Sequence, residues 1–202
     1  GPAMRVGDRV FAIRYAGIGG FRQLEQWYRM GQAQNLDEFK DAMRLHALPM
    51  FNTGYGDRDG NLFYVYNALL PKRADGHDWS GTVPGNTRNT LWKEYRPFDE
   101  LPTVENPKSG FIQNCNSDPF QTTTGEDNPD ETAFSKNYGI EKWMTNRARR
   151  AVELYGDDES ITHDEFFRYK YDKQYSENSK LRQRIASFIE AQSGNSELEE
   201  EI

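Results

Sequence analysis

Two β-rich runs separated by a short turn constrain the fold of this sequence more than any other feature. The runs are MFNTGYGD (residues 50–57) and NLFYVYNALL (residues 61–70), and the link Arg58–Asn61, which contains Gly60, joins them. A Gly-bearing link of this length between two alternating runs is a strong signal for a β-hairpin. The chain is therefore expected to contain antiparallel strands.

Two helices are expected before this hairpin. Residues 21–33 place apolar side chains at helical spacing. Asn35 then resembles an N-cap, with Glu38 three residues later in a capping-box-like pattern. The expected apolar face of the second helix is Leu36, Phe39, Ala42, Met43 and Leu45, and Pro49 is expected to close it.

The carboxyl-terminal part of the chain has a different pattern. From Gly139 on it reads as helical, first over residues 140–155, then in a helix capped by Thr162 with Glu165 three residues on, and last over residues 177–192. Further strands are expected at residues 9–15 (RVFAIRY) and 109–115 (SGFIQNC). The predicted fold class is α+β, in the order β-α-α-β-β-loop-β-α-α-α, with mostly antiparallel strands.

Composition shifts divide the chain into segments. Residues 1–4 resemble a remnant of cloning, and residues 5–138 form the mixed part of the chain. This part holds a long loop over residues 71–108, rich in Pro, Gly, Asn and aromatic residues, and a loop of that length is usually ordered and functional. Residues 139–202 form a helical segment that ends in an acidic tail.

Charge and hydropathy exclude some classes of partner. The net charge of -7 argues against a nucleic-acid-binding surface, which is normally basic. The sequence contains no apolar run of the roughly 18 residues that a membrane span needs. The single cysteine, Cys115, excludes an internal disulfide and a multi-cysteine metal site.

Several familiar site patterns are incomplete. The turn Gly17–Gly20 lacks the third glycine of a dinucleotide-binding fingerprint, because position 22 is Arg. His46, His77 and His163 are far apart and have no neighbour at metal-ligand spacing, so a loop-stabilising role is favoured for His77.

Another pattern resembles a calcium-binding loop but is incomplete. Asp57, Asp59 and Asn61 have the alternating spacing of calcium ligands, but the glutamate that should follow is missing. Turn chemistry is the simpler explanation. The sequence therefore predicts no cofactor.

The segment NPKSGFIQNCNSDPF (residues 106–120) places Asn114 and Asn116 around Cys115. Asparagine weakens a strand because its side chain competes for backbone hydrogen bonds. Two of them here indicate either a loop or a requirement for a placed amide. On a strand, Asn114 and Asn116 would point to the same side.

Four stretches in this order resemble the penicillin acylase family of N-terminal-nucleophile amidohydrolases, which includes acyl-homoserine-lactone and cyclic-lipopeptide acylases. The stretches are QWYRMGQAQNLDEFKDAM, FNTGYGDRDGNLFYVYNALLPKR, GHDWSGTVPG and ELPTVENPKSGFIQNCNSDP. Over about residues 9–170 the chain looks like an internal fragment of the β subunit. The resemblance implies part of an αββα sandwich, a linear amide substrate, and a periplasmic or secreted parent protein.

The resemblance also implies roles for residues. Asn116 matches the family's asparagine that donates its side-chain amide N–H to the oxyanion hole, and Asn114 is expected to hold Asn116 or its loop in place. Arg147, with Arg149 as the alternative, matches an arginine beside that asparagine.

The sequence departs from the family pattern in two respects. The nucleophilic Ser that self-cleavage exposes in this family is not found here and is expected upstream, and the family's calcium-binding carboxylates are not recognisable. The chain is expected to be inactive alone, to need the remainder of the parent acylase, and to self-associate through an unpaired sheet edge. The alternative is a stand-alone binding or structural module without catalysis, with the 71–108 loop as its ligand or partner surface.

Overall fold

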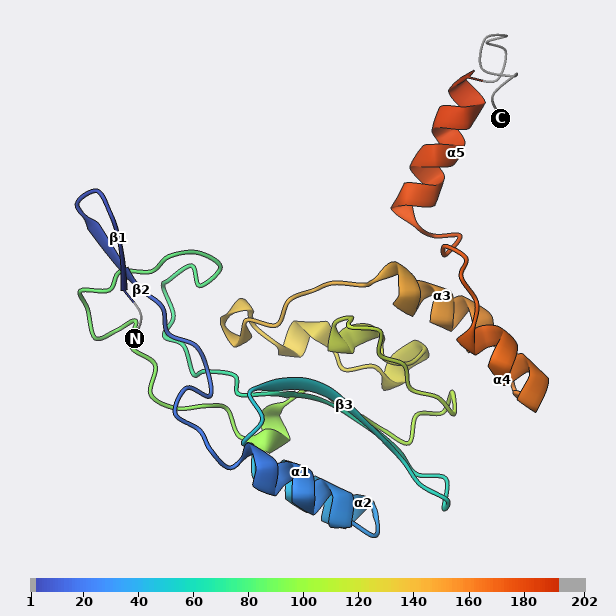
Figure 1. Ribbon diagram of the computed structural model, residues 1–202, viewed down its shortest axis with the longest axis horizontal. Helices are drawn as coiled ribbons and strands as arrows, with labels where there is room; N and C mark the ends of the chain where they lie inside the picture. Colours follow the sequence, from blue (N-terminus) through green and yellow to red (C-terminus); the bar gives the residue numbers. More distant parts are fainter. Residues whose placement is uncertain (1–2, 193–202) are drawn as a thin grey trace. The chain divides into compact units, whose positions relative to one another are not determined.

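The computed structural model describes residues 3–192 (Figure 1). The chain forms two compact units. The first unit runs to Ile112 and takes in Asp118–Lys142. The second comprises Gln113–Ser117 and the chain from Trp143 onward. Gly1, Pro2 and the predicted acidic tail lie outside the described residues.

A three-stranded antiparallel sheet forms the centre of the first unit. Its strands are β3 (Met50–Gly56), β4 (Leu62–Ala68) and β5 (Thr103–Glu105), in the order β3-β4-β5. The β3–β4 pairing runs from Met50 opposite Ala68 to Gly56 opposite Leu62, which confirms the predicted hairpin. A second hairpin pairs β1 (Ala3–Val6) with β2 (Arg9–Ala12), so the predicted strand at 9–15 is shorter and its partner was not predicted.

The central strand β4 is covered on both faces. Phe63 lies on the face of α2 (Leu36–Met43), where Lys40 Nζ is 5.1 Å from the centre of its ring. Tyr64 faces the opposite way, as strand alternation requires, and it is 1% exposed, with its hydroxyl donating to Asn52 Oδ1 at 2.6 Å. The buried core comprises Leu36, Phe39, Met43, Phe63, Tyr64, Val65, Tyr66, Ala68, Leu70, Phe98, Leu101 and Val104.

Local capping explains where the first helices lie. α1 (Gln23–Gln32) and α2 are confirmed, and the Asn35 side chain accepts from the Glu38 N–H at 2.9 Å. Glu38 accepts from the Gln34 N–H at 2.9 Å and from the side-chain Nδ2 of the N-cap Asn35 at 3.2 Å. α2 ends at Met43, well before Pro49, and Leu45 is only partly buried.

The returning segment of the first unit consists of short 3₁₀ turns. They are η2 (Pro119–Gln121), η3 (Gly125–Asp127), η4 (Glu131–Ala133) and η5 (Lys136–Tyr138). The long loop expected over residues 71–108 holds η1 (Phe98–Glu100) and β5 near its end.

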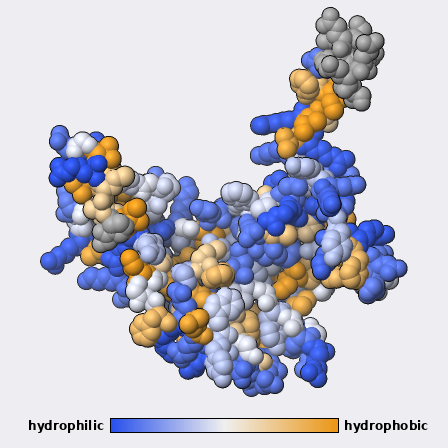
Figure 2. Space-filling view, viewed as in Figure 1, coloured by the Kyte–Doolittle hydropathy of each residue, from blue (hydrophilic) through white to orange (hydrophobic). Residues whose placement is uncertain are grey.

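The second unit contains α3 (Asn146–Tyr155), α4 (His163–Lys170) and α5 (Lys180–Gln192). Thr162 and Glu165 form the predicted reciprocal capping box of α4. Apolar side chains stand out along α5 in Figure 2, where Leu181, Ile185, Phe188 and Ile189 are all at least half exposed. Within residues 3–192, no helix is both long enough and apolar enough to cross a membrane.

One predicted strand is wrong, and one predicted helix begins later than expected. Residues 109–115 form no strand, because Gly110 adopts a positive φ of 72° and the asparagines that follow form a turn. The helix predicted from residue 140 begins only at Asn146, because Gly139 takes the left-handed conformation and Thr145 supplies the N-cap.

Candidate functional site

The segment from Asn114 to Ser117 is a side-chain-stabilised turn. Asn114 Oδ1 accepts from the Asn116 N–H at 3.0 Å, and Asn114 Nδ2 donates to the Ser117 carbonyl at 3.3 Å. Asn116 has a φ of 60°, a left-handed conformation that asparagine tolerates better than most residues. Asparagine therefore suits both positions of the turn, for different reasons.

The amino-terminal end of α3 is bonded to this turn. Thr145 Oγ1 donates to the Cys115 carbonyl at 3.0 Å and accepts from the Ala148 N–H at 3.0 Å. Arg147 Nη2 donates to the same carbonyl at 3.2 Å and to Asn116 Oδ1 at 2.8 Å. Three hydrogen bonds thus join the start of α3 to the turn within the second unit.

The Arg147 contact orients the Asn116 carboxamide. Because the oxygen Oδ1 accepts from the guanidinium, the amide nitrogen Nδ2 lies on the other branch of the group. Across residues 3–192, Nδ2 donates to no protein group, and Asn116 is exposed. A hydrogen bond from a charged donor to the amide oxygen also polarises the N–H bonds and strengthens them as donors. The arrangement presents a neutral, oriented N–H donor.

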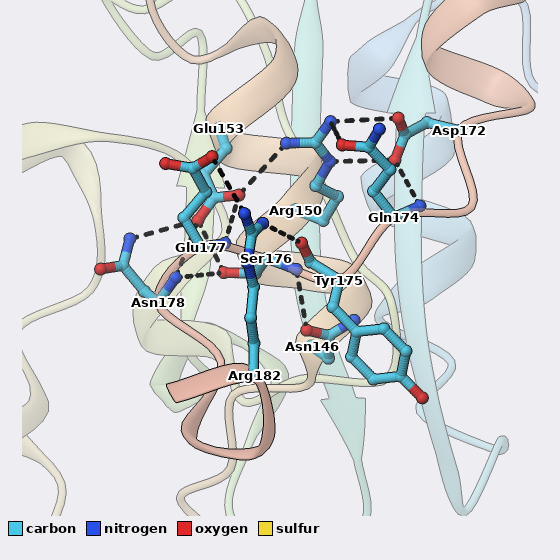
Figure 3. Close-up of polar contacts among 10 residues, drawn as sticks. All are labelled: Asn146, Arg150, Glu153, Asp172, Gln174, Tyr175, Ser176, Glu177, Asn178 and Arg182. Carbon is cyan, nitrogen blue, oxygen red and sulfur yellow. Dashed lines mark hydrogen bonds and ion pairs between the residues drawn. The ribbon is translucent and has the colours of Figure 1, made fainter. Parts of the chain in front are cut away.

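A polar clamp fixes the carboxyl-terminal half of α3 (Figure 3). Glu153 accepts from Ser176 Oγ at 2.6 Å, from the Glu177 N–H at 3.2 Å, and from Asn178 Nδ2 at 3.1 Å. Burial alone would raise the pKa of Glu153, but these hydrogen bonds outweigh it and lower the pKa below its ordinary value. The carboxylate is therefore ionised at neutral pH and binds the segment after α4 to α3.

Arg150 extends the clamp on the neighbouring helical turn. Its Nε and Nη2 donate to the two oxygens of Asp172 at 2.9 and 3.0 Å, a bidentate ion pair with both side chains largely shielded. The hydrogen bond from Arg150 lowers the pKa of Asp172. Asn146 Oδ1, at the first position of α3, accepts from the Ser176 N–H at 3.0 Å. The segment that follows α4, residues 172–178, therefore contacts α3 near both of its ends.

Tyr155, at the end of α3, is partly buried. Burial, with a smaller contribution from Cys115, raises the pKa of its hydroxyl to about 12. The hydroxyl stays protonated at neutral pH.

The structure places three of the predicted site residues together. Asn114, Asn116 and Arg147 contact one another directly or through the turn, whereas in the described chain the Arg149 guanidinium does not reach it. Sequence reasoning missed Thr145 and the Cys115 carbonyl. A Thr three residues before Ala148 is an N-cap signal that could have located the start of α3.

The other candidate residues take structural positions. Asp57 accepts from the Asp59 and Asn61 N–H groups, at 3.0 and 2.9 Å, and from Asn61 Nδ2 at 2.9 Å, which is the predicted turn chemistry. His46 Nε2 lies 2.8 Å from the Ala68 carbonyl, and burial lowers its pKa. The His77 ring packs edge-on against Trp79. Among residues 3–192, no group of three or more His, Cys, Asp or Glu side chains is arranged to hold a metal ion.

A cleft of about 1060 Å³ lies in the first unit. Its lining includes Arg73, His77 and Trp79 from the long loop, with Phe120, Phe134 and Lys136 from the returning segment. In the described chain Arg73 Nε is buried without a hydrogen-bond partner, and burial lowers the pKa of this arginine.

Sequence comparisons with known proteins point to a single family. The profile of the penicillin amidase family matches residues 1–200. Penicillin G acylase of Escherichia coli is 39% identical over 93 residues, which cover 46% of this chain and 11% of that protein. The acyl-homoserine lactone acylase PvdQ of Pseudomonas syringae pv. tomato is 36% identical over 62 residues, covering 30% of this chain and 8% of that protein.

A solved structure shares the fold. Thermostable penicillin G acylase from Alcaligenes faecalis matches with a TM-score of 0.56 and 23% identity, over 76% of this chain and 25% of that one. The chain thus matches only a small part of the length of its relatives. The mixed α+β architecture with antiparallel sheets corresponds to part of that structure.

Proposed function

This chain belongs to the penicillin amidase family, and from this premise we propose that it is part of an acylase that hydrolyses a linear amide. The names of its relatives favour a penicillin or an acyl-homoserine lactone as the substrate type, with a lipopeptide as a third possibility. The residues that choose among these acyl groups are expected largely outside this chain.

In the proposed mechanism, a Ser upstream of this chain, freed by self-cleavage, attacks the amide carbonyl with its own α-amino group as the base. Negative charge then develops on the carbonyl oxygen. Asn116 Nδ2 and a backbone N–H from the missing part stabilise that oxyanion, the amine leaves, and water releases the acid. One such donor can lower the barrier by roughly 3 to 4 kcal/mol.

The observation that carries this proposal is the orientation of the Asn116 amide. Arg147 occupies the oxygen, so the N–H groups are left for a ligand. Arg147 itself keeps the amide from rotating and, by its positive charge, favours an oxyanion nearby. Asn114 holds the backbone of Asn116 and completes the proposed site.

The proposal is tested with the complete gene. The intact mass of the purified product is measured, and the product is assayed on a penicillin, an acyl-homoserine lactone and a lipopeptide. We expect two chains, the larger beginning at a Ser upstream of this sequence, and release of the acid from at least one substrate. A single uncut chain with no hydrolysis would overturn the proposal.

The cleft in the first unit favours one alternative, a binding module without catalysis. An unpaired Arg73 among aromatic side chains suits an anionic ligand with an apolar body. Saturable binding of benzoate by the 202-residue chain, abolished in Arg73→Met, combined with a parent protein that hydrolyses nothing, would support this alternative.

Four further features belong to the same proposal. We propose that the β3–β4–β5 sheet contributes to an αββα sandwich, and that the parent protein is periplasmic or secreted. We also propose that the chain alone is inactive and self-associates through a sheet edge. β3 is the outer strand of the described three-stranded sheet, which supports the last point.

A further inference from the structure

Thr145 joins two parts of the second unit through a single hydroxyl. The oxygen accepts from the Ala148 N–H, which caps α3, and its proton is donated to the Cys115 carbonyl. Both partners lie at 3.0 Å. The hydroxyl therefore uses its donor and one acceptor position at the same time.

This double contact sets the distance between Arg147 and Asn116. Arg147 is two residues beyond Thr145 on α3, and Asn116 directly follows Cys115 in the turn. When the hydroxyl bonds to the Cys115 carbonyl, the start of the helix and the turn are held in register. Arg147 bonds to the same carbonyl at 3.2 Å and to Asn116 Oδ1 at 2.8 Å, so its contacts are made across the same junction.

We propose that Thr145 is a positioning residue for the oxyanion donor of this acylase. The proposal rests on the proposed function, because it assigns Thr145 an effect on the reaction through Asn116 and Arg147. Thr145 does not touch the substrate. Its hydroxyl fixes where the Asn116 amide points, and a small displacement of an oriented group can lower a rate strongly.

Three variants of the full parent enzyme separate this role from helix capping. Thr145→Val removes both hydrogen bonds with little change in shape. Thr145→Ser keeps both. Thr145→Asp keeps a good N-cap but has no proton for the Cys115 carbonyl at neutral pH.

The matched control is Thr162→Val. Thr162 caps α4 in the same unit, accepting from the Glu165 N–H at 3.3 Å and donating to Glu165 Oε2 at 2.7 Å. Its bonds stay within the start of α4. It therefore reports what the loss of an N-cap hydroxyl does without a bond to the turn.

We expect kcat to fall about tenfold in Thr145→Val and Thr145→Asp, with KM within about twofold of the wild type. Thr145→Ser should restore kcat, and Thr162→Val should leave it unchanged while lowering the unfolding temperature. Wild-type kcat in Thr145→Asp would overturn the proposal, since capping alone would then be sufficient. Should Thr145→Val not fold, the comparison of Asp with Ser decides the question.

A negative result for Thr145 can be distinguished from failure of the proposed function. A parent protein that hydrolyses no amide contradicts the proposed function before any variant is made. An active parent in which Thr145→Asp retains full kcat contradicts only the role of Thr145.

Discussion

The three-stranded sheet and the turn beside α3 are stabilised in opposite ways. Around β4, nearly every side chain is buried, and apolar residues such as Phe63, Val65 and Val104 are at most 2% exposed. At the turn, Asn114 and Asn116 are exposed, and directional hydrogen bonds to the side chains of Asn114, Thr145 and Arg147 hold the backbone.

The two kinds of contact have different effects, one on the stability of the fold and the other on the geometry of the site. Apolar burial is large in free energy but tolerates small shifts, because it is not directional. Hydrogen bonds contribute about 1 kcal/mol each but fix positions within tenths of an ångström. The sheet should therefore determine whether the first unit folds, and the polar contacts should determine where the Asn116 amide points.

The largest effect on stability is expected from Phe63→Ala. Removing a buried ring leaves a cavity against α2, and the free energy of unfolding should fall by about 3 to 5 kcal/mol. Urea unfolding of the chain, followed by far-UV circular dichroism, measures it. The control is Phe51→Ala on β3, where the side chain is 47% exposed and about 1 kcal/mol or less is expected. Equal losses in the two variants would contradict the account of the core.

A smaller loss is expected from Glu153→Gln in the clamp on α3. The neutral amide is a weaker acceptor for Ser176, Glu177 and Asn178, and one of its two ends is a donor facing other donors. The free energy of unfolding should fall by about 1 to 3 kcal/mol at pH 7. An unchanged urea midpoint would show that the clamp does not stabilise the second unit.

Acid should reproduce part of this loss in the wild-type chain. The folded pKa of Glu153 lies below its ordinary value of 4.5, so its contribution is complete above about pH 4.5 and is lost as the pH falls through the folded pKa. Carboxylates titrate over a range of about pH 5 to pH 3. Across this range, the free energy of unfolding should fall more for the wild type than for Glu153→Gln. Parallel pH profiles for the two chains would contradict this assignment.

Elements with local signals were predictable from the sequence. Asn35 with Glu38, Thr162 with Glu165, and the link around Gly60 carry their own capping or turn chemistry within a few residues. Tertiary context was not needed to interpret them.

The turn at residues 114–117 and the start of α3 were not predicted. Residues 109–115 were predicted to be a short strand, but Asn114 bonds to the Asn116 backbone, and the segment forms no strand. The Arg147–Asn116 contact joins positions 31 residues apart, and only the resemblance to a family pointed to it. Thr145 was overlooked because the helix was expected to begin before it.

The central claim is that Asn116 supplies an amide N–H to the reaction while Arg147 holds its oxygen. The most direct test is kcat of the processed parent enzyme with Asn116→Asp, beside Asn116→Gly, which retains the left-handed backbone at this position. Asp keeps the size and the oxygen that faces Arg147 but has no N–H to donate.

The account predicts that kcat falls by about 10²- to 10³-fold in both variants, with the unfolding midpoint of Asn116→Asp equal to or above that of the wild type. A kcat of Asn116→Asp within about threefold of the wild type would contradict the central claim, because a lost oxyanion donor costs far more.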